Sequence, residues 1–210
     1  MLSRMSLRDR KRARTRQALV DAATELFASK GYDETTIADI AAAAEIGTRT
    51  FFAYFASKEE LLFPDSDARV QATLDAIATR TPDEGPTEVL ARALVGAAEI
   101  SDDMVSRLAV LRTRLMRTVP AVRGRALQVQ LDAQHQIARH LAEAFPDRLD
   151  HVGAAALTGA FVGAISGALQ ALLDGADQPA DPTTLHTAIR TATDVALTPW
   201  REHLARQPAR

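Results

Sequence analysis

The sequence predicts an all-α protein, and three features of its composition support this fold class. Alanine occupies 41 of the 210 positions, whereas glycine and proline together occupy only 19, so most of the chain favours helix. Hydrophobic side chains make up 47% of the residues, enough for the core of one sizeable domain or of two small ones. The chain contains no alternating run of β-branched residues that would indicate a strand.

Several classes of protein are excluded by what the sequence lacks. There is no cysteine, which excludes disulfide scaffolds, thiol catalysis and cysteine-ligated metals, and which favours a reducing, cytoplasmic location. The five histidines are scattered, so we expect no metal and no cofactor. Nucleophile-elbow, zinc-protease, P-loop and dinucleotide-binding motifs are absent, so we expect no enzyme activity.

The formal net charge of −2 is unevenly distributed along the chain. The first 20 residues contain one aspartate and seven basic residues, which are Arg4, Arg8, Arg10, Lys11, Arg12, Arg14 and Arg16; the remaining 190 carry −8. This asymmetry predicts a basic arm on an acidic body, although a solvated, disordered tail would have the same composition.

Four helices are predicted before residue 64. The first runs from about residue 10 to residue 30 and ends at Gly31. Thr36 and Asp39 form a capping box for a second helix that ends near Ala44, and a third, rich in aromatics, spans residues 48–55. A second capping box, Ser57 with Glu60, predicts the start of a fourth.

Two short helices joined by a three-residue turn, Glu45 to Gly47, match the helix-turn-helix motif that enters the DNA major groove. Five of the seven phenylalanines precede position 64, which gives this segment a core of its own. We therefore expect a DNA-binding domain at residues 1–63 and an effector-binding and dimerisation domain at residues 64–210.

Further helices are expected in the second domain at about residues 65–79, 87–100, 102–117, 120–145 and 152–173, and from residue 181 past residue 195. Their apolar stripes suggest where a ligand would bind. Gln134 and His135 flank the stripe of the helix that starts at Pro120, and polar groups on a buried face need a partner. The candidate ligand-binding residues are Met104, Leu108, Leu111, Leu115, Leu131, Gln134 and His135; another side chain or the backbone would satisfy the two polar groups equally well.

Residues 152–173 carry no charge and are long enough to span a bilayer. Half of them are glycine or alanine, however, which favours a buried helix in a soluble bundle, and we expect no membrane partner. Large residues form one face, and Gly159, Gly163 and Gly167, with Gln170, form a nearly opposite one. This second face predicts close approach of a partner helix in a homodimer; burial within one subunit is the alternative.

Residues 15–61 resemble the tetracycline-repressor (TetR) family of bacterial transcription regulators. The resemblance rests on Leu26-Phe27, Gly31-Tyr32, the run Thr35 to Ala41, and the run Thr50 to Leu61. It implies a homodimer whose two recognition helices bind successive major grooves of a near-palindromic operator.

Residue roles follow from this resemblance and from chemistry. Thr48 and Arg49 begin the recognition helix and are the best placed to reach base edges; a contact with phosphate alone is the alternative for Arg49. Thr50, Tyr54 and Lys58 resemble the family's phosphate-contacting positions, and Thr36, at a helix start, also suits a phosphate. The three phenylalanines Phe51, Phe52 and Phe55 are expected to hold the helix in place. Arg12 and Arg14 of the basic arm are expected to add DNA contacts.

The chain also departs from the family pattern. Glu45, Ile46 and Gly47 stand where the turn usually has glycine, an aliphatic residue and serine, and Phe52 stands where tyrosine is common. These changes affect the expected DNA affinity rather than the fold. The run Leu115 to Pro120 resembles a subgroup that binds acyl-CoA-like ligands, so we expect a small hydrophobic effector.

The function predicted from the sequence is a homodimeric DNA-binding transcriptional regulator, a repressor released from double-stranded operator DNA by this effector. The alternative is a helical lipid-carrier or protein-interaction module without DNA binding.

Overall fold

A computed structural model describes residues 6–100, 106–174 and 181–206, and these residues form helices and connecting turns without strands. In chain order the elements are α1 (Leu7–Ser29), α2 (Ile37–Ala43), α3 (Thr48–Phe51), the 3-10 helix η1 (Glu59–Leu62), α4 (Ser66–Ala78), α5 (Pro86–Ile100), α6 (Arg107–Thr118), α7 (Pro120–Ala144), α8 (His151–Leu173) and α9 (Pro182–Arg206). The predicted all-α class is confirmed.

The chain divides into two compact units. The first contains residues 1–64 together with residues 115–125, and the second contains residues 65–114 and 126–210. Helices α6 and α7 therefore each contribute residues to both units.

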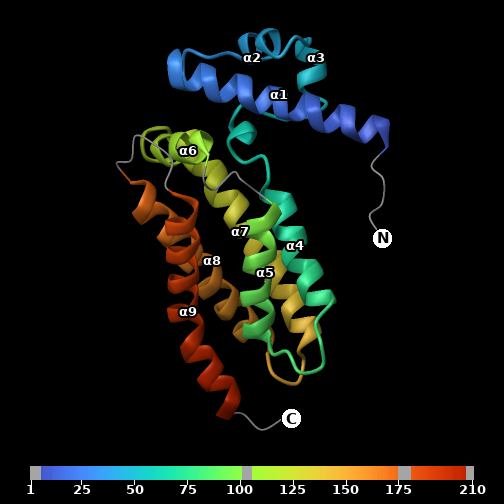
Figure 1. Cartoon of the computed structure of the whole chain (residues 1–210), viewed down its shortest axis with the longest axis vertical. Helices are drawn as coiled ribbons and strands as arrows, with labels where there is room; N and C mark the ends of the chain where they lie inside the picture. The colour runs from blue at the N-terminus through green and yellow to red at the C-terminus, as the bar shows by residue number, and fades with distance from the viewer. Residues whose placement is uncertain (1–5, 101–105, 175–180, 207–210) are drawn as a thin grey trace. The chain divides into compact units, whose positions relative to one another are not determined.

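In the first unit, α1 lies against α2 and η1, and α2 lies against α3 (Figure 1). The core of this unit is aromatic: Phe51 and Phe55 are almost fully buried, with ring centroids 6.1 Å apart. Phe27 and Tyr32 form a second buried pair at 5.0 Å. Each fully buried side chain of this size contributes about 1.5–3 kcal/mol relative to an exposed one, so this cluster supports helices that are too short to be stable alone.

The predicted starts of α2 and α3 agree with the structure, and those of the other two helices of this unit differ. The Thr36 and Asp39 capping box is present, with the Asp39 amide donating to Thr36 Oγ1 at 3.1 Å. Helix α1 begins earlier than predicted, because Ser6 and Asp9 form a capping box that the sequence analysis overlooked. The predicted capping box at Ser57 is wrong: the Glu60 carboxylate accepts from the Ala56 amide at 2.7 Å, and only the short η1 follows.

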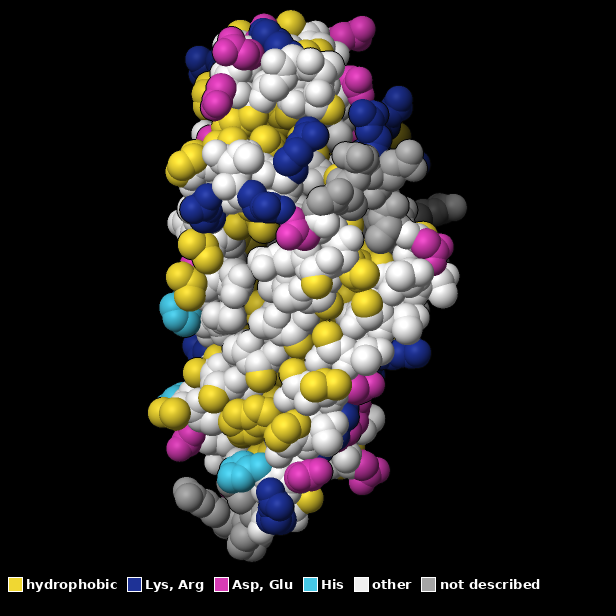
Figure 2. Space-filling model, turned by 90° about the vertical axis from the view of Figure 1, so that its left-hand side faces the viewer, with side chains coloured by type: hydrophobic (Ala, Val, Ile, Leu, Met, Phe, Trp, Pro, Cys, Tyr) yellow, Lys and Arg dark blue, Asp and Glu magenta, His cyan; other side chains and the backbone are white. Residues whose placement is uncertain are grey.

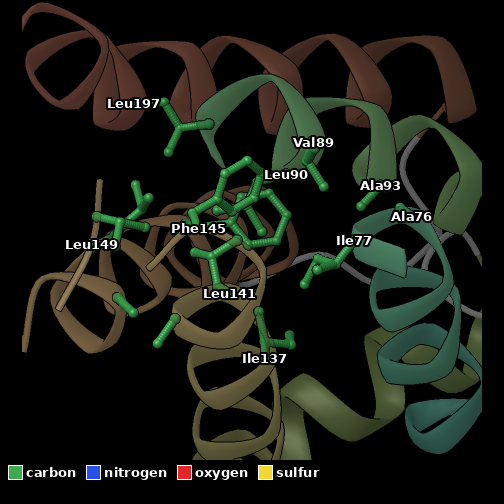
Figure 3. Packing of buried hydrophobic residues seen from close by; sticks show 14 of the residues in the cluster. Ala76, Ile77, Val89, Leu90, Ala93, Ile137, Leu141, Phe145, Leu149 and Leu197 are labelled. Carbon is green, nitrogen blue, oxygen red and sulfur yellow. The ribbon is translucent and has the colours of Figure 1, made fainter. Parts of the chain in front are cut away.

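The second unit is a helical bundle in which α4 packs on α5, α5 on α9, and α8 along α9. Its main core contains Leu90, Leu141, Phe145, Leu157 and Leu197, part of which is drawn in Figure 3. A smaller cluster forms where Leu185 and Ile189 of α9 meet large residues of α8.

The sequence predicts that the inward stripe of α7 consists of Leu127, Leu131, Ala138, Leu141 and Phe145, and this prediction is partly wrong. Leu127 and Leu131 are 54% and 52% exposed, whereas Val122, Ile137 and Leu141 are buried. In the N-terminal half of α7, Val122 is buried and Ala126, Val129 and Ala133 are half-buried, so the leucines of the sequence pattern indicated the wrong inward face.

Helix α8 is the helix among the described residues that is long and apolar enough to cross a membrane, with a mean hydropathy of 1.7. Only 22% of the apolar 18-residue stretch of α8 is buried within the chain. Length and composition alone are weak evidence for a membrane span, since core helices of soluble proteins share them.

Candidate nucleic-acid interface

The candidate DNA-contacting surface is the beginning of α3, where Thr48, Arg49 and Thr50 are all exposed. The helix begins after Gly47, whose carbonyl accepts from the amides of Thr50 and Phe51 at 2.9 and 3.1 Å. It is shorter than predicted, because regular helix ends at Phe51 and turns replace it over residues 52–54. Three polar side chains thus project from a segment that is anchored by one buried ring, Phe51.

The turn before α3 contains Glu45, the non-glycine residue of the described chain that has a positive φ, +56°. Its amide donates to the Ala42 carbonyl and the next amide, of Ile46, donates to Ala41, which closes α2 in a Schellman motif. Glycine normally occupies this position, and a side chain there costs of order 1 kcal/mol or more. The backbone of Glu45 is therefore strained, and its exposed carboxylate lies beside the candidate DNA surface.

Phe52 is placed differently from its neighbours. The sequence predicted that Phe51, Phe52 and Phe55 together hold α3, but Phe52 is 57% exposed, with its ring edge-on to Phe51 at 5.4 Å. The prediction is therefore wrong for Phe52, because positions 51 and 55 lie one turn apart on the buried face and position 52 does not.

Arg12 of α1 is engaged within the protein. Its guanidinium lies over the Tyr54 ring at 5.2 Å and donates to the Ala53 carbonyl at 3.4 Å. One turn later, Arg16 lies over the Phe55 ring at 4.4 Å and donates to the Pro64 carbonyl at 2.7 Å. Both arginines therefore fasten the segment that follows α3 to the long helix α1.

The predicted basic arm is helical from Leu7 onward, which contradicts the idea of a disordered tail for this part of the chain. Arg14 is exposed. Residues two positions apart on a helix point in different directions, so Arg14 cannot contact the Tyr54 ring alongside Arg12. Arg4 lies outside the described residues.

Thr36 and Lys30 set the electrostatics at the start of α2. The Thr36 side chain accepts from the Asp39 amide, and the Lys30 ammonium lies 2.7 Å from the Asp39 carboxylate. The hydrogen bond from Lys30, followed by those from Thr36, lowers the pKa of Asp39 to about 2. Thr36 is exposed, and its hydroxyl, which also donates to the Asp39 carboxylate, can rotate to donate to an acceptor such as a phosphate oxygen.

Lys58 has several partners within the first unit. Its ammonium donates to the Tyr32 carbonyl at 2.9 Å and to the Thr35 carbonyl at 3.2 Å, and lies 4.1 Å from the centroid of the Tyr32 ring. The Tyr32 hydroxyl donates to Glu59, and burial together with this bond raises the pKa of Tyr32. Burial of Glu59 opposes ionisation, but hydrogen bonds from Ser57 and Tyr32 outweigh it and lower the pKa of Glu59.

Residues 115–125 join this unit through an ion pair that the sequence analysis missed. Arg125 at the start of α7 lies 3.1 Å from the Glu60 carboxylate of η1. Arg123 donates to the carbonyls of Met116 and Arg117 and so caps the C-terminal end of α6. Because the partners are 65 positions apart in the sequence, no local pattern indicates this pair.

The candidate ligand-binding residues differ in exposure. Leu108, Leu111 and Leu115 of α6 are buried, Gln134 is half-buried, and Leu131 and His135 are exposed. Met104 lies outside the described residues. Among the candidate dimer residues of α8, Gly163, Gly167 and Gln170 are exposed and Gly159 is half-exposed.

A small helix-turn-helix unit followed by a larger helical bundle defines a class of two-part bacterial regulators, and the comparisons with known proteins specify the family. Residues 19–63 match the model described as bacterial regulatory proteins of the tetR family, and residues 84–206 match the MftR C-terminal domain of that family. The chain belongs to the TetR family of bacterial regulatory proteins.

Two curated regulators illustrate the similarity. The transcriptional regulator TcmR of Streptomyces glaucescens is 34% identical over 141 residues, which cover 65% of this chain and 62% of TcmR. MftR of Mycobacterium tuberculosis, whose name refers to mycofactocin biosynthesis, is 40% identical over 74 residues, 34% of this chain and 37% of MftR. The matched segments thus span less than two thirds of these relatives. Both are transcriptional regulators and not enzymes.

Solved structures share the fold at low sequence identity. A TetR-family regulator from Syntrophomonas wolfei has a TM-score of 0.63 at 17% identity and covers 89% of this chain and 96% of its own. FadR of Thermus thermophilus, solved with lauroyl-CoA, has a TM-score of 0.52 at 22% identity, with 87% and 93% coverage.

Removing the Lys30 ammonium should raise the pKa of Asp39. In a Lys30→Met variant we expect it to rise from about 2 toward the usual 3.8 without reaching it, because the hydrogen bonds from Thr36 remain. Since the folded-state pKa is the lower one, ionised Asp39 stabilises the fold above about pH 4, and this contribution is lost as the pH falls toward 2. Carboxyl 13C NMR titration measures the shift. Lys11→Met, on exposed α1, is the control, and equal Asp39 pKa values in both variants would contradict the assignment.

Proposed function

We propose that the protein is a homodimeric, cytoplasmic transcriptional repressor that binds a near-palindromic DNA operator and is released from it by a small hydrophobic effector. One observation carries the DNA-binding part: Thr48, Arg49 and Thr50 are exposed at the start of a helix that Phe51 anchors in the core. Family membership supports the same interpretation.

The residue roles follow from the chemistry of each group. The Arg49 guanidinium suits bidentate donation to the O6 and N7 atoms of guanine, and Thr48 can donate to a neighbouring base edge. The hydroxyls of Thr36, Thr50 and Tyr54 suit phosphate oxygens, which position the domain without reading sequence. Exposed Phe52 adds an apolar surface of the kind that contacts thymine methyl groups.

Arg49 and Thr50 provide a matched pair for testing these roles. Duplexes selected from a random-sequence pool give the preferred site, and binding is then measured for every single-base variant of it. Arg49→Ala should lose about tenfold or more of the discrimination at one base pair per half-site. Thr50→Val, which removes a hydroxyl and keeps the shape, should weaken all sequences equally.

Uniform weakening by both substitutions would contradict the role of Arg49 in reading bases. Failure of the wild-type protein to bind any duplex at low salt would contradict DNA binding itself and favour a carrier or interaction module.

The dimer is proposed to form through the small-residue face of α8, together with α9. This face carries no charge, and a Cβ added at Gly163 would meet no atom beyond its own helical turn within 4 Å. The face of the second unit that carries α9 presents hydrophobic and uncharged side chains in its middle, with charged side chains mostly toward its margins (Figure 2). Exposed surface of this kind is typical of an interface, since glycines permit close approach of helices.

A leucine at position 163 should therefore produce monomers. Gly163→Leu has room within its own chain and should leave the protomer folded while blocking the approach of the partner. Gly124→Leu, at an exposed glycine of α7 that also has no neighbour within 4 Å, is the matched control. Sedimentation equilibrium distinguishes the two; a dimer in both variants would rule out this face.

The effector is proposed to be an acyl-CoA or a similar amphipathic acyl compound. The support is the resemblance at residues 115–120 and the lauroyl-CoA held by the FadR structure. Helices α6 and α7 contribute to both compact units, so the covalent chain offers a route by which a ligand in the second unit influences the first.

Lauroyl-CoA is the probe for this part of the proposal. It should weaken binding of the selected duplex by about 5- to 150-fold, a coupling of roughly 1–3 kcal/mol, and DNA should weaken lauroyl-CoA binding by the same factor. Coenzyme A alone and laurate alone separate recognition of the nucleotide from recognition of the chain. Unchanged DNA affinity with all three compounds in a mobility-shift titration would exclude this effector class.

A further inference from the structure

A cavity of about 210 Å³ opens at one end of the helical bundle of the second unit. It is bounded by the connection between α7 and α8, by the first turn of α8 and by the last two turns of α9, which lie at the same end of this bundle (Figure 1). Drug-sized ligands occupy pockets of about 300–1,000 Å³, so this smaller cavity suits a compound with a single ring. All of its lining residues belong to the second unit, so the cavity is complete without the first unit.

The apolar wall of the cavity contains Leu149, Leu204 and Trp200. The two leucines are 5% and 3% exposed, so they form a firm surface. Trp200 is half-buried, packs against the main core of the unit and meets the His203 ring edge-on, with ring centroids 6.1 Å apart. An indole that is already held in place can receive a ligand without a further cost in ordering.

The polar wall contains the carboxylates of Asp147 and Asp150. Asp150 caps α8, because its Oδ1 atom accepts from the Gly153 amide at 2.7 Å. Asp147 is exposed, and no group of the described residues pairs with its side chain. The cavity therefore has one uncommitted carboxylate on the same rim as an indole ring.

The positive charge of Arg148, which also lines the cavity, is directed toward another acidic residue. Its Nη1 atom and the Oε2 atom of Glu88 lie 3.0 and 2.5 Å from the point where a Cβ on Gly85 would stand, so the two opposite charges are neighbours. Arg148 thus offsets Glu88, and the charge that remains at the cavity is the negative charge of the two aspartates.

We propose that this cavity binds a small organic ammonium ion whose apolar part is a single ring. The ammonium donates to Asp147 and lies against Trp200, since a carboxylate and an aromatic face both stabilise a cation. The ring of the ligand occupies the apolar wall formed by Leu149 and Leu204. This ligand class is opposite in charge to an acyl-CoA, so the cavity is a binding site additional to that of the proposed effector.

Trp200 makes binding directly observable, because it is the only tryptophan of the chain. Its fluorescence, excited beyond the absorption of tyrosine, is followed while the full chain is titrated with phenethylamine, phenethyl alcohol or phenylpropionate. These probes share a phenyl ring and are cationic, neutral and anionic. Titration to about 10 mM covers the affinity that ordinary ligand efficiency gives molecules of this size.

Phenethylamine should change the emission saturably and bind about tenfold more tightly than phenethyl alcohol, and phenylpropionate should bind more weakly than both. Equal affinities for the amine and the alcohol, tighter binding of phenylpropionate, or no saturable change with phenethylamine would each overturn the proposal.

Two aspartates provide a matched pair of variants. Asp147→Asn removes the charge and keeps the size, so it should weaken phenethylamine about tenfold and leave phenethyl alcohol unchanged. Asp132→Asn, at an exposed position of α7 away from the cavity lining, should bind both compounds as the wild type does. The same phenethylamine affinity in the two variants would exclude Asp147 as the partner of the cation.

The indole is tested by Trp200→Phe, which keeps an apolar ring but offers a weaker face to a cation. Because this change removes the fluorescent reporter, binding is measured by titration calorimetry for this variant and for the wild type. Phenethylamine should bind several-fold more weakly to the variant, with a smaller change for phenethyl alcohol. An equal loss for both compounds would show that the ring contributes apolar contact alone and would overturn its role in binding the cation.

Discussion

A helix of four residues cannot maintain its own geometry, and this constraint governs the first unit of the structure. Helix α3 ends at Phe51, so the orientation of Thr48 and Arg49 depends on contacts outside the helix. Buried Phe51 and Phe55 provide the apolar part of these contacts. Arg12 and Arg16 hold the segment that follows α3, and Lys58 holds the loop that precedes α2; each places a cation against an aromatic ring while donating to at least one backbone carbonyl. Such a cation satisfies backbone groups that regular helix leaves unpaired, and it immobilises an aromatic side chain at the same time.

The two faces of α8 show how one composition can serve two purposes. Leu157 and Phe161 pack in the core of the second unit. Ile165 and Leu169 pack against the cluster formed by Leu185 and Ile189 of α9. The opposite face consists mainly of glycine and alanine and is exposed in the isolated chain. A helix without charge on its open face favours contact with another apolar surface over contact with water. The properties that make α8 resemble a membrane span are thus the ones that suit a helix shared between protomers.

Much of the fold was predictable because it is encoded locally. Helix boundaries set by Thr36 with Asp39, by Pro120 and by Pro182 agree with the structure, since a cap or a proline acts within a few residues. The predictions failed where tertiary contacts override local signals. The Glu60 carboxylate accepts from the Ala56 amide instead of forming a capping box with Ser57. On α7, packing against neighbouring helices decides which residues face inward, and Leu127 and Leu131 are exposed.

The candidate DNA surface shows the same difference between features that are encoded locally and features that depend on tertiary contacts. The residue types at the start of α3 follow from the motif, and their exposure agrees with it. The partners of Arg12 and Lys58 are up to 42 and up to 26 positions distant in sequence, so composition identifies both residues as basic without revealing where the charge is used. Counting basic residues near a helix-turn-helix therefore overestimates the charge available to a phosphate backbone.

The Arg125–Glu60 ion pair belongs to a unit that is discontinuous along the chain. During synthesis, the first 64 residues are made before residue 125, so the N-terminal segment first exists without one of its ion-pair partners. A fragment that ends at Pro64 would remain in that incomplete state permanently. Fusion or truncation experiments that treat the first 64 residues as an autonomous module would for this reason examine a less complete structure than the one in the full chain.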